Sequence, residues 1–161
     1  MQPLVYSATA ALRNEQFYFA CAFGMETCKQ RYKTQYVQLS DLLFELDLAR
    51  NDGTYKKVQG KYANPVLLIV EEWHLLKPTE SEQHDILELL HRRRRKSSTI
   101  FCSRYDSNGC YNQLGGDDSP LSEAILGCIK HDACKMNIIP ADAANYKSMQ
   151  EVYGLNPALS K

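Results

Sequence analysis

The sequence lacks any apolar run long enough to span a bilayer. A membrane helix needs roughly 20 apolar residues, and the apolar stretch Pro65–Val70 is far shorter. The N-terminus also lacks the basic segment followed by an apolar one that marks an exported chain. We therefore expect a cytoplasmic protein that is neither exported nor inserted into a membrane.

The chain also lacks net charge, because 19 Lys and Arg residues balance 19 Asp and Glu residues. No global field then marks it for nucleic acid or a membrane surface, so any such partner must be contacted by a local patch. Its 161 residues, 44% of them hydrophobic, have the size and composition of one globular domain. We expect a single compact domain.

The six cysteines include no Cys-x2-Cys pair. Four ligands at zinc spacing are therefore missing, which argues against a structural zinc site. A disulfide framework is typical of short secreted chains, and this chain is neither short nor preceded by a signal peptide. We expect reduced thiols.

Strand and helix signals alternate along the chain, which predicts an α/β fold with a mostly parallel sheet. The predicted strands are Leu4–Tyr6, Tyr36–Leu39, Val66–Val70, Ser98–Cys102 and Met136–Ile139. The predicted helices are Phe17–Lys29, one capped by Ser40–Asp41, Thr54–Tyr62, one from Pro78 to the basic run ending at Lys96, and one begun by Ser119–Pro120. Loops are expected at Ser7–Asn14 and from Ser103 through Asp118. Residues 1–139 would form the core and residues 140–161 a loosely packed polar tail.

Val66–Val70 is followed directly by two carboxylates, Glu71 and Glu72. An apolar strand that ends in acidic residues has the form of a Walker B strand. In a P-loop ATPase the first carboxylate helps to hold Mg²⁺, and the second orients or deprotonates the attacking water. Acidic residues can equally end a buried strand and face solvent, and the motif alone leaves both interpretations open.

A Walker B strand needs a partner loop, GxxxxGK[ST], whose backbone N–H groups cradle phosphates. No segment of the chain matches it. The expected place, Ser7–Tyr18 after the first strand, contains no glycine. Because Cβ atoms crowd the space that phosphates would occupy, such a loop cannot easily wrap a phosphate.

Five segments carry a family resemblance when taken together: Tyr18–Glu26, Val66–Trp73, Ser98–Ser103, Gly115–Leu121 and Ile129–Ala133. With them the chain closely resembles the IstB-like ATP-binding proteins, AAA+ helper ATPases of insertion-sequence transposition, over roughly Pro3 to Ile139. The resemblance implies a three-layer α/β fold of the P-loop NTPase type. It further implies ATP and Mg²⁺ as cofactors, DNA binding, assembly into a homo-oligomer and a transposase as partner.

The resemblance also assigns roles to residues. Glu71 would help to hold Mg²⁺ in place of the usual Asp, Glu72 would prepare the attacking water, and Ser103 would sense the γ-phosphate. Ser103 is also an ordinary residue for a strand end. Trp73 is expected to pack beneath the nucleotide site.

The phosphate-binding lysine has two candidate positions. Counting from the first strand places Arg13 at the family's Walker A lysine and Asn14 at its Thr or Ser, whereas counting back from Ala20 places Gln16 and Phe17 there. Neither register preserves the glycines, so the Walker A loop is degenerate.

Two further departures from the family are visible. Gly127 and Cys128 stand where the family commonly has an Asp-Arg pair, so a candidate phosphate-contacting arginine is absent. Longer family members carry a helical segment before the ATPase core, and this chain begins almost at the first strand, so we expect a truncated copy.

The densest basic cluster consists of five consecutive residues: Arg92, Arg93, Arg94, Arg95 and Lys96. It could contact DNA phosphates, or it could be a solvated helix end that complements the helix dipole.

Taken together, the family resemblance and the degenerate Walker A loop predict a transposition helper whose ATP hydrolysis is weakened or lost. The alternatives are a non-catalytic module that binds transposase, intact helper subunits or DNA, and a decayed transposon remnant.

Overall fold

The computed structural model describes residues 5–10, 13–73, 77–103, 105, 107–116, 119–130 and 133–138, and the statements below refer to these residues. Its strands are β1 (Val5–Ala10), β2 (Thr34–Gln38), β3 (Leu67–Glu71), β4 (Ser98–Ser103) and β5 (Ala133–Ile138). Its helices are α1 (Arg13–Lys29), α2 (Leu39–Asn51), α3 (Tyr55–Ala63), α4 (Glu80–Arg93), α5 (Ser107–Gln113) and α6 (Pro120–Lys130). The tail expected over residues 140–161 lies outside the described residues.

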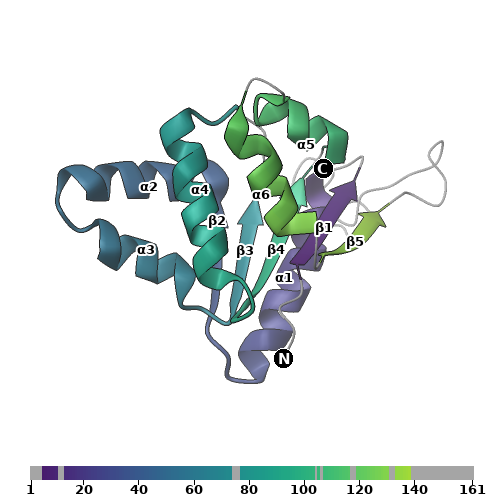
Figure 1. Ribbon diagram of the computed structural model, residues 1–161. Helices are drawn as coiled ribbons and strands as arrows, with labels where there is room; N and C mark the ends of the chain where they lie inside the picture. Colours follow the sequence, from purple (N-terminus) through teal and green to yellow (C-terminus); the bar gives the residue numbers. More distant parts are fainter. Residues whose placement is uncertain are drawn as a thin grey trace, which may run out of the picture.

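The five strands form one sheet in the order β2-β3-β4-β1-β5, and all described pairings are parallel. Helix α1 covers one face of this sheet, and α2 to α6 lie on the other (Figure 1). The predicted three-layer α/β fold with a parallel sheet is therefore confirmed. Parallel strands need helical crossovers, and these crossovers bury both faces of the sheet.

Strand β3 lies in the interior of the sheet, as its continuous apolar sequence predicts. All five of its residues are buried, which fits a strand covered on both faces. On the α1 side it packs against Ala20, and Gly24 lets α1 approach closely, because a Cβ there would meet Ile69 Cδ1 at 3.1 Å. The larger core lies on the other side, where Leu68 and Val70 pack under α2, α4 and α6.

The prediction of a loop over Ser7–Asn14 is wrong. Strand β1 runs to Ala10 and α1 begins at Arg13, so only positions 11 and 12 separate them. The longer strand has a tertiary cause, because β1 pairs with β4 on one side and with β5 on the other. Residues 7–10, expected to be loop, thus gain two neighbouring strands.

Two other local predictions are also wrong. Helix α2 begins at Leu39 directly after β2, with Gln38 as its N-cap, so Ser40 and Asp41 lie inside its first turn rather than capping it. The loop predicted through Asp118 contains α5, which buries Cys110 and is followed by the fully buried Leu114. In both segments, burial of apolar side chains outweighs the local preference of polar residues for turns.

Candidate functional site

The sequence-predicted site residues come together at the carboxyl edge of the sheet. Glu71 ends β3, Ser103 ends β4 opposite Thr9 of β1, and Arg13 begins the helix that follows β1. The backbone N–H of Trp73 donates to the carbonyl of Cys102 at 2.9 Å, which extends the β3–β4 contact past the strand ends. In open parallel sheets this edge is where ligands bind.

The side chain of Glu71 is buried on the α1 side of the sheet, with 7% of its surface exposed. The hydroxyl of Tyr36 on the neighbouring strand β2 donates a hydrogen bond to its carboxylate. The two side chains share one face because Tyr36 lies two residues before Gln38, the strand partner of Glu71. Burial and this hydrogen bond raise the pKa of Tyr36, so the phenol remains a donor.

Two thiols complete the surroundings of Glu71. Burial, followed by the negative charge of Glu71, raises the pKa of Cys102 to about 12. The same two causes raise the pKa of Cys21 on α1. Both thiols are therefore neutral at physiological pH, and the carboxylate expected to hold Mg²⁺ lies among a phenol and two neutral thiols.

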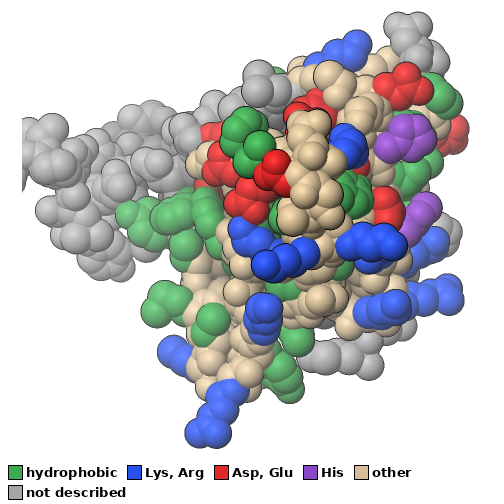
Figure 2. Space-filling model, turned by 90° about the vertical axis from the view of Figure 1, so that its left-hand side faces the viewer, with side chains coloured by type: hydrophobic (Ala, Val, Ile, Leu, Met, Phe, Trp, Pro, Cys, Tyr) green, Lys and Arg blue, Asp and Glu red, His purple; other side chains and the backbone are tan. Residues whose placement is uncertain are grey.

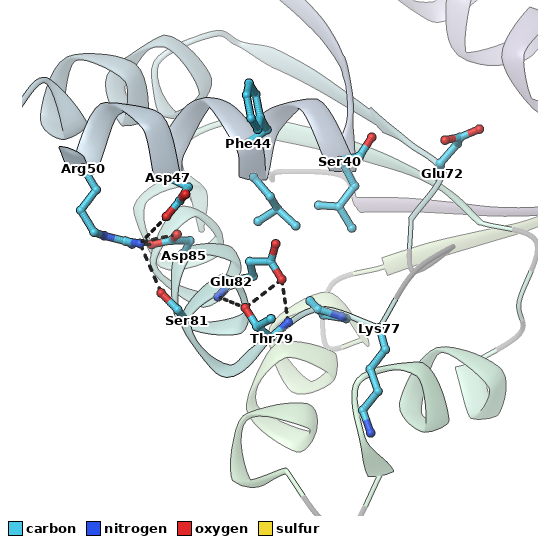
Figure 3. A pocket seen from close by; sticks show the side chains of 13 residues that line it. Ser40, Phe44, Asp47, Arg50, Glu72, Lys77, Thr79, Ser81, Glu82 and Asp85 are labelled. Carbon is cyan, nitrogen blue, oxygen red and sulfur yellow. Dashed lines mark hydrogen bonds and ion pairs between the residues drawn. The ribbon is translucent and has the colours of Figure 1, made fainter. Parts of the chain in front are cut away.

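Glu72 turns toward the opposite side of the sheet. Its backbone has φ of 55°, in the left-handed region that non-glycine residues rarely adopt. Its side chain lines a cavity of about 460 Å³ between α2 and the start of α4. Figure 3 shows Glu72 and Lys77 at one end of this cavity and Arg50 with Asp85 at the other. The two adjacent carboxylates thus lie on opposite sides of the sheet, Glu71 facing α1 and Glu72 facing the cavity beside α2.

Ser103, the proposed γ-phosphate sensor, is 1% exposed. Its hydroxyl donates to the carbonyl of Trp73 at 3.1 Å and accepts the backbone N–H of Tyr105 at 3.1 Å. Trp73 is itself buried and packs against Phe101, with 4.3 Å between ring centroids. In this structure Ser103 holds the backbone after β3 and β4 together.

Arg13 and Asn14 are the first residues of α1. The GxxxxGK[ST] motif places about six loop positions before its lysine. If Arg13 stands for the lysine, those positions include residues 7–10, which lie in β1, and if Gln16 does, they include residues 13–15, which lie in α1. In either register regular structure occupies most of the loop, so the described residues do not form a phosphate cradle.

The basic cluster divides into one buried residue and four exposed ones. Arg93 is 2% exposed, and its guanidinium bonds to Thr99 Oγ1 and to four backbone carbonyls, those of Tyr62, Ala63, Pro65 and Ser98. The expectation that Arg93 contacts DNA is therefore wrong. Arg92, Arg94, Arg95 and Lys96 remain exposed.

Sequence reasoning missed the roles of two residues, Tyr36 beside Glu71 at the carboxyl edge of the sheet and Arg93 near the amino ends of β3 and β4. Tyr36 gave no signal, because its role depends on the register between β2 and β3. The basic residues on both sides of Arg93 obscured its role. Helical spacing could have found it, because Arg93 lies four residues after the buried Leu89, on the apolar face of α4. The described residues contain no cluster of three or more potential metal ligands and no helix suited to crossing a membrane.

Solved structures show the fold of the chain. The chain superposes on the crystal structure of DnaI with a TM-score of 0.73 and 18% identity, covering 86% of this chain and 73% of that one. It superposes on the replication initiator DnaA bound to AMPPCP and single-stranded DNA with a TM-score of 0.70 and 14% identity, covering 84% of this chain and 40% of that one. The fold is that of the P-loop AAA+ proteins.

The sequence then identifies the family. Residues 15–151 match the family described as IstB-like ATP binding protein, and the chain belongs to this family. It is 31% identical over 121 residues to the insertion sequence ATP-binding protein y4pL of Sinorhizobium fredii, a match that covers 75% of this chain and 49% of the relative. It is 34% identical over 91 residues to the IS1162 ATP-binding protein of Pseudomonas fluorescens, covering 56% and 39%. The chain thus spans half or less of the length of these relatives.

Proposed function

We propose that this protein is a helper of insertion-sequence transposition that acts with a transposase on DNA, and that its ATP binding and hydrolysis are weakened or lost. Membership of the IstB-like family supports the helper role, because its relatives are named insertion sequence ATP-binding proteins. The AAA+ fold supports the same class of protein.

The short connection between β1 and α1 carries the proposal of weakened ATP binding. A phosphate-binding loop works by turning successive backbone N–H groups toward the phosphates. Here the backbone pairs with a neighbouring strand as far as Ala10, and it is helical from Arg13 onward. The two intervening positions are Ala and Leu, which lack the conformational freedom of glycine.

The remaining site residues support the same proposal. One oxygen of the Glu71 carboxylate already accepts a hydrogen bond from Tyr36, and only 7% of the residue is exposed, so Glu71 is poorly placed to meet a metal ion. Ser103 would have to give up its bonds to the backbone around Trp73 and Tyr105 to meet a phosphate. The rearrangement of Ser103 costs hydrogen bonds in a buried setting, where an unpaired polar group is expensive.

The test is titration calorimetry of the protein with ATP, with and without Mg²⁺. We expect no saturable binding at millimolar ATP, and Arg13→Ala should leave the titration unchanged. Micromolar, Mg²⁺-dependent binding that Arg13→Ala weakens would contradict the proposal, because it would show that the start of α1 still contacts phosphates.

A second candidate function is a non-catalytic interaction module that binds transposase, intact helper subunits or DNA without nucleotide. Four exposed cations favour a module that binds DNA: Arg92 in the last turn of α4, and Arg94, Arg95 and Lys96 after it. Co-sedimentation with DNA in the absence of ATP is the discriminating measurement. Binding that needs no nucleotide supports the module, whereas binding that strictly requires ATP supports an active helper.

A further inference from the structure

A separate cleft lies at the amino edge of the sheet, opposite the edge that holds Glu71 and Ser103. Its volume is about 260 Å³. The end of α3 and the residues that lead into β3 form one wall, and the end of α4 with the turn before β4 forms the other. The lining residues are Ala63, Asn64, Val66, Arg92, Lys96 and Ser97. Because ligands of open parallel sheets bind at the carboxyl edge, this cleft is distinct from the candidate nucleotide site.

Both charged residues that line the cleft are cations, Arg92 and Lys96. Among its described contacts, Arg92 pairs with Glu88 through Nε alone, at 3.3 Å, so its two Nη groups remain for a ligand. Lys96 is exposed and has no ion pair with a described residue. The amide of Asn64 and the hydroxyl of Ser97 add neutral hydrogen-bond donors to the wall. The cleft therefore combines positive charge with donors, and no carboxylate is among its lining residues.

The buried Arg93 removes an obstacle to anion binding. Carbonyls at the end of a helix carry partial negative charge, which repels an anion. Here the guanidinium of Arg93 donates to the carbonyls of Tyr62, Ala63 and Pro65, in the segment that forms one wall of the cleft. None of the described partners of Arg93 is a carboxylate, so its positive charge adds to that of the cleft.

The turn after α4 places Lys96 in the same cleft as Arg92. Arg95 has φ of 61°, in the left-handed region. The chain folds back so that the backbone N–H groups of Lys96 and Ser97 both donate to the carbonyl of Arg93, at 3.0 and 3.2 Å. Two like charges that line one small cleft repel each other, and a bound anion relieves this repulsion.

The wider distribution of charge favours the same ligand. Figure 2 views the side of the molecule formed by α2 and α3, and Lys and Arg side chains gather on the lower part of this side. The lower part corresponds to the amino edge of the sheet, which lies at the bottom of Figure 1. Acidic side chains gather higher on the same side. An anion that approaches the amino edge therefore meets a positive field.

We propose that this cleft binds the phosphate group of a phosphate monoester between Arg92 and Lys96. A phosphate monoester carries about two negative charges at neutral pH, which two cations match, whereas each phosphodiester of a nucleic-acid backbone carries a single charge. The planar guanidinium of Arg92 suits two phosphate oxygens at once. The inference goes beyond the proposed function, because it involves neither the nucleotide edge nor Arg94 and Arg95. The phosphate comes either from a small phosphorylated molecule or from the terminal phosphate of a DNA strand.

Titration calorimetry with inorganic phosphate tests the cleft. We expect saturable binding, which Arg92→Ala and Lys96→Ala should each weaken by about tenfold, because each variant removes a charge-assisted hydrogen bond. Arg92→Lys should recover part of the loss, since it restores the charge but not the fork of donors. Lys57→Ala is the matched control, because Lys57 is an exposed cation in the first turn of α3, at the far end of that helix from the cleft. It should leave the affinity almost unchanged, because salt screens distant exposed charges.

A DNA strand with a terminal phosphate and the same strand with a terminal hydroxyl distinguish the two sources. Tighter binding of the phosphorylated strand, abolished by Arg92→Ala, identifies the strand end as the ligand. Equal binding of the two strands, together with saturable phosphate binding, identifies a small phosphorylated molecule. Dimethyl phosphate, a diester, should bind more weakly than inorganic phosphate. The proposal is overturned if phosphate does not bind saturably, if the cleft variants lose no more affinity than Lys57→Ala, or if dimethyl phosphate binds equally well.

Discussion

The guanidinium of Arg93 donates a hydrogen bond to the carbonyl oxygen of Pro65 at 2.9 Å, which ties the end of α4 to the segment that leads into β3. The same side chain also bonds to Thr99 Oγ1 at 2.9 Å and to the carbonyl of Tyr62 at 2.9 Å. Burial lowers the pKa of Arg93 to about 10, so it remains a cation at neutral pH. One buried cation thus satisfies the carbonyls of two separate segments, residues 62–65 and Ser98.

Arg93→Ala is therefore expected to lower the free energy of unfolding by about 3 kcal/mol, because it leaves several buried carbonyls without a donor. Arg93→Lys should recover only part of the loss, since an ammonium cannot reproduce the planar fork of donors. Urea denaturation measures both. Arg94→Ala, at an exposed position, is the control and should change stability by no more than about 0.5 kcal/mol. Equal losses for Arg93→Ala and Arg94→Ala would contradict the role of Arg93.

Thr79 caps α4 through a capping box. Its hydroxyl accepts the backbone N–H of Glu82 at 3.4 Å, and the Glu82 carboxylate accepts the backbone N–H of Thr79 at 2.6 Å. Thr79→Ala should lower the free energy of unfolding by about 1 kcal/mol. Thr54, the N-cap of α3, makes no side-chain capping bond. Thr54→Ala should therefore lower the free energy of unfolding by only about 0.3 kcal/mol. Thermal unfolding of the two variants side by side tests the difference, and a reversed order would contradict it.

Glu45 on α2 makes stability depend on pH. Its carboxylate accepts hydrogen bonds from Lys61 and Tyr62 of α3, and the Lys61 bond is the main cause that holds the pKa of Glu45 below its ordinary value of 4.5. A carboxyl with a lowered folded-state pKa stabilises the protein above its unfolded pKa, and this contribution disappears as the pH falls through the folded value.

We expect Glu45→Gln to be less stable than the unmodified protein at pH 7, with a difference that shrinks as the pH falls below 4.5. Urea denaturation at several pH values measures this. Lys61→Met is the reciprocal variant and should abolish most of the pH-dependent difference. If the difference in free energy of unfolding between Glu45→Gln and the unmodified protein grows as the pH falls, the pH dependence has the opposite sign. That result would refute the role of Glu45.

The exposed cations at the end of α4 are expected to set any DNA affinity of the chain. Replacing Arg94 and Arg95 by Ala should weaken DNA binding uniformly across sequences and should reduce the salt slope by about 1 for each lost phosphate contact. The double variant Lys56→Ala and Lys57→Ala on α3 removes the same amount of exposed charge and is the matched control. Fluorescence anisotropy at several salt concentrations measures the slopes. Equal effects of the two double variants would show that net charge, rather than this cluster, governs binding.

The fold class could be predicted from the sequence because its signals are local and strong. The continuous apolar run before Glu71 predicts a strand covered on both faces, and β3 has every residue buried. Pro78 and the acidic residues after it predict the helix α4, and the structure begins this helix at Glu80, with Thr79 as its N-cap. The missing glycines before Phe17 likewise predicted a damaged phosphate loop, since only glycine provides the backbone freedom which that loop requires.

The candidate site could be predicted only in part. The sequence placed Glu71 and Ser103 at strand ends, and parallel pairing brings them to one edge. It could not show that Glu71 and Glu72 face different sides of the sheet, or that Tyr36 binds Glu71. Those relationships depend on the register between β2 and β3 and on the left-handed backbone at Glu72.

The sequence by itself determined the alternation of strands and helices and the loss of the glycine-rich motif, because each depends on residues close together in the chain. It also determined the family of this protein, because several short motifs along the chain match that family. Only the tertiary structure decided that residues 7–10 are strand rather than loop, and that Arg93 is buried while Arg94 is exposed. The physical reason is that pairing and burial depend on segments far apart in the sequence. Pairing with two neighbouring strands makes a strand of residues 7–10. Backbone carbonyls that accept hydrogen bonds from Arg93 hold this one residue of the five-residue basic cluster in the core.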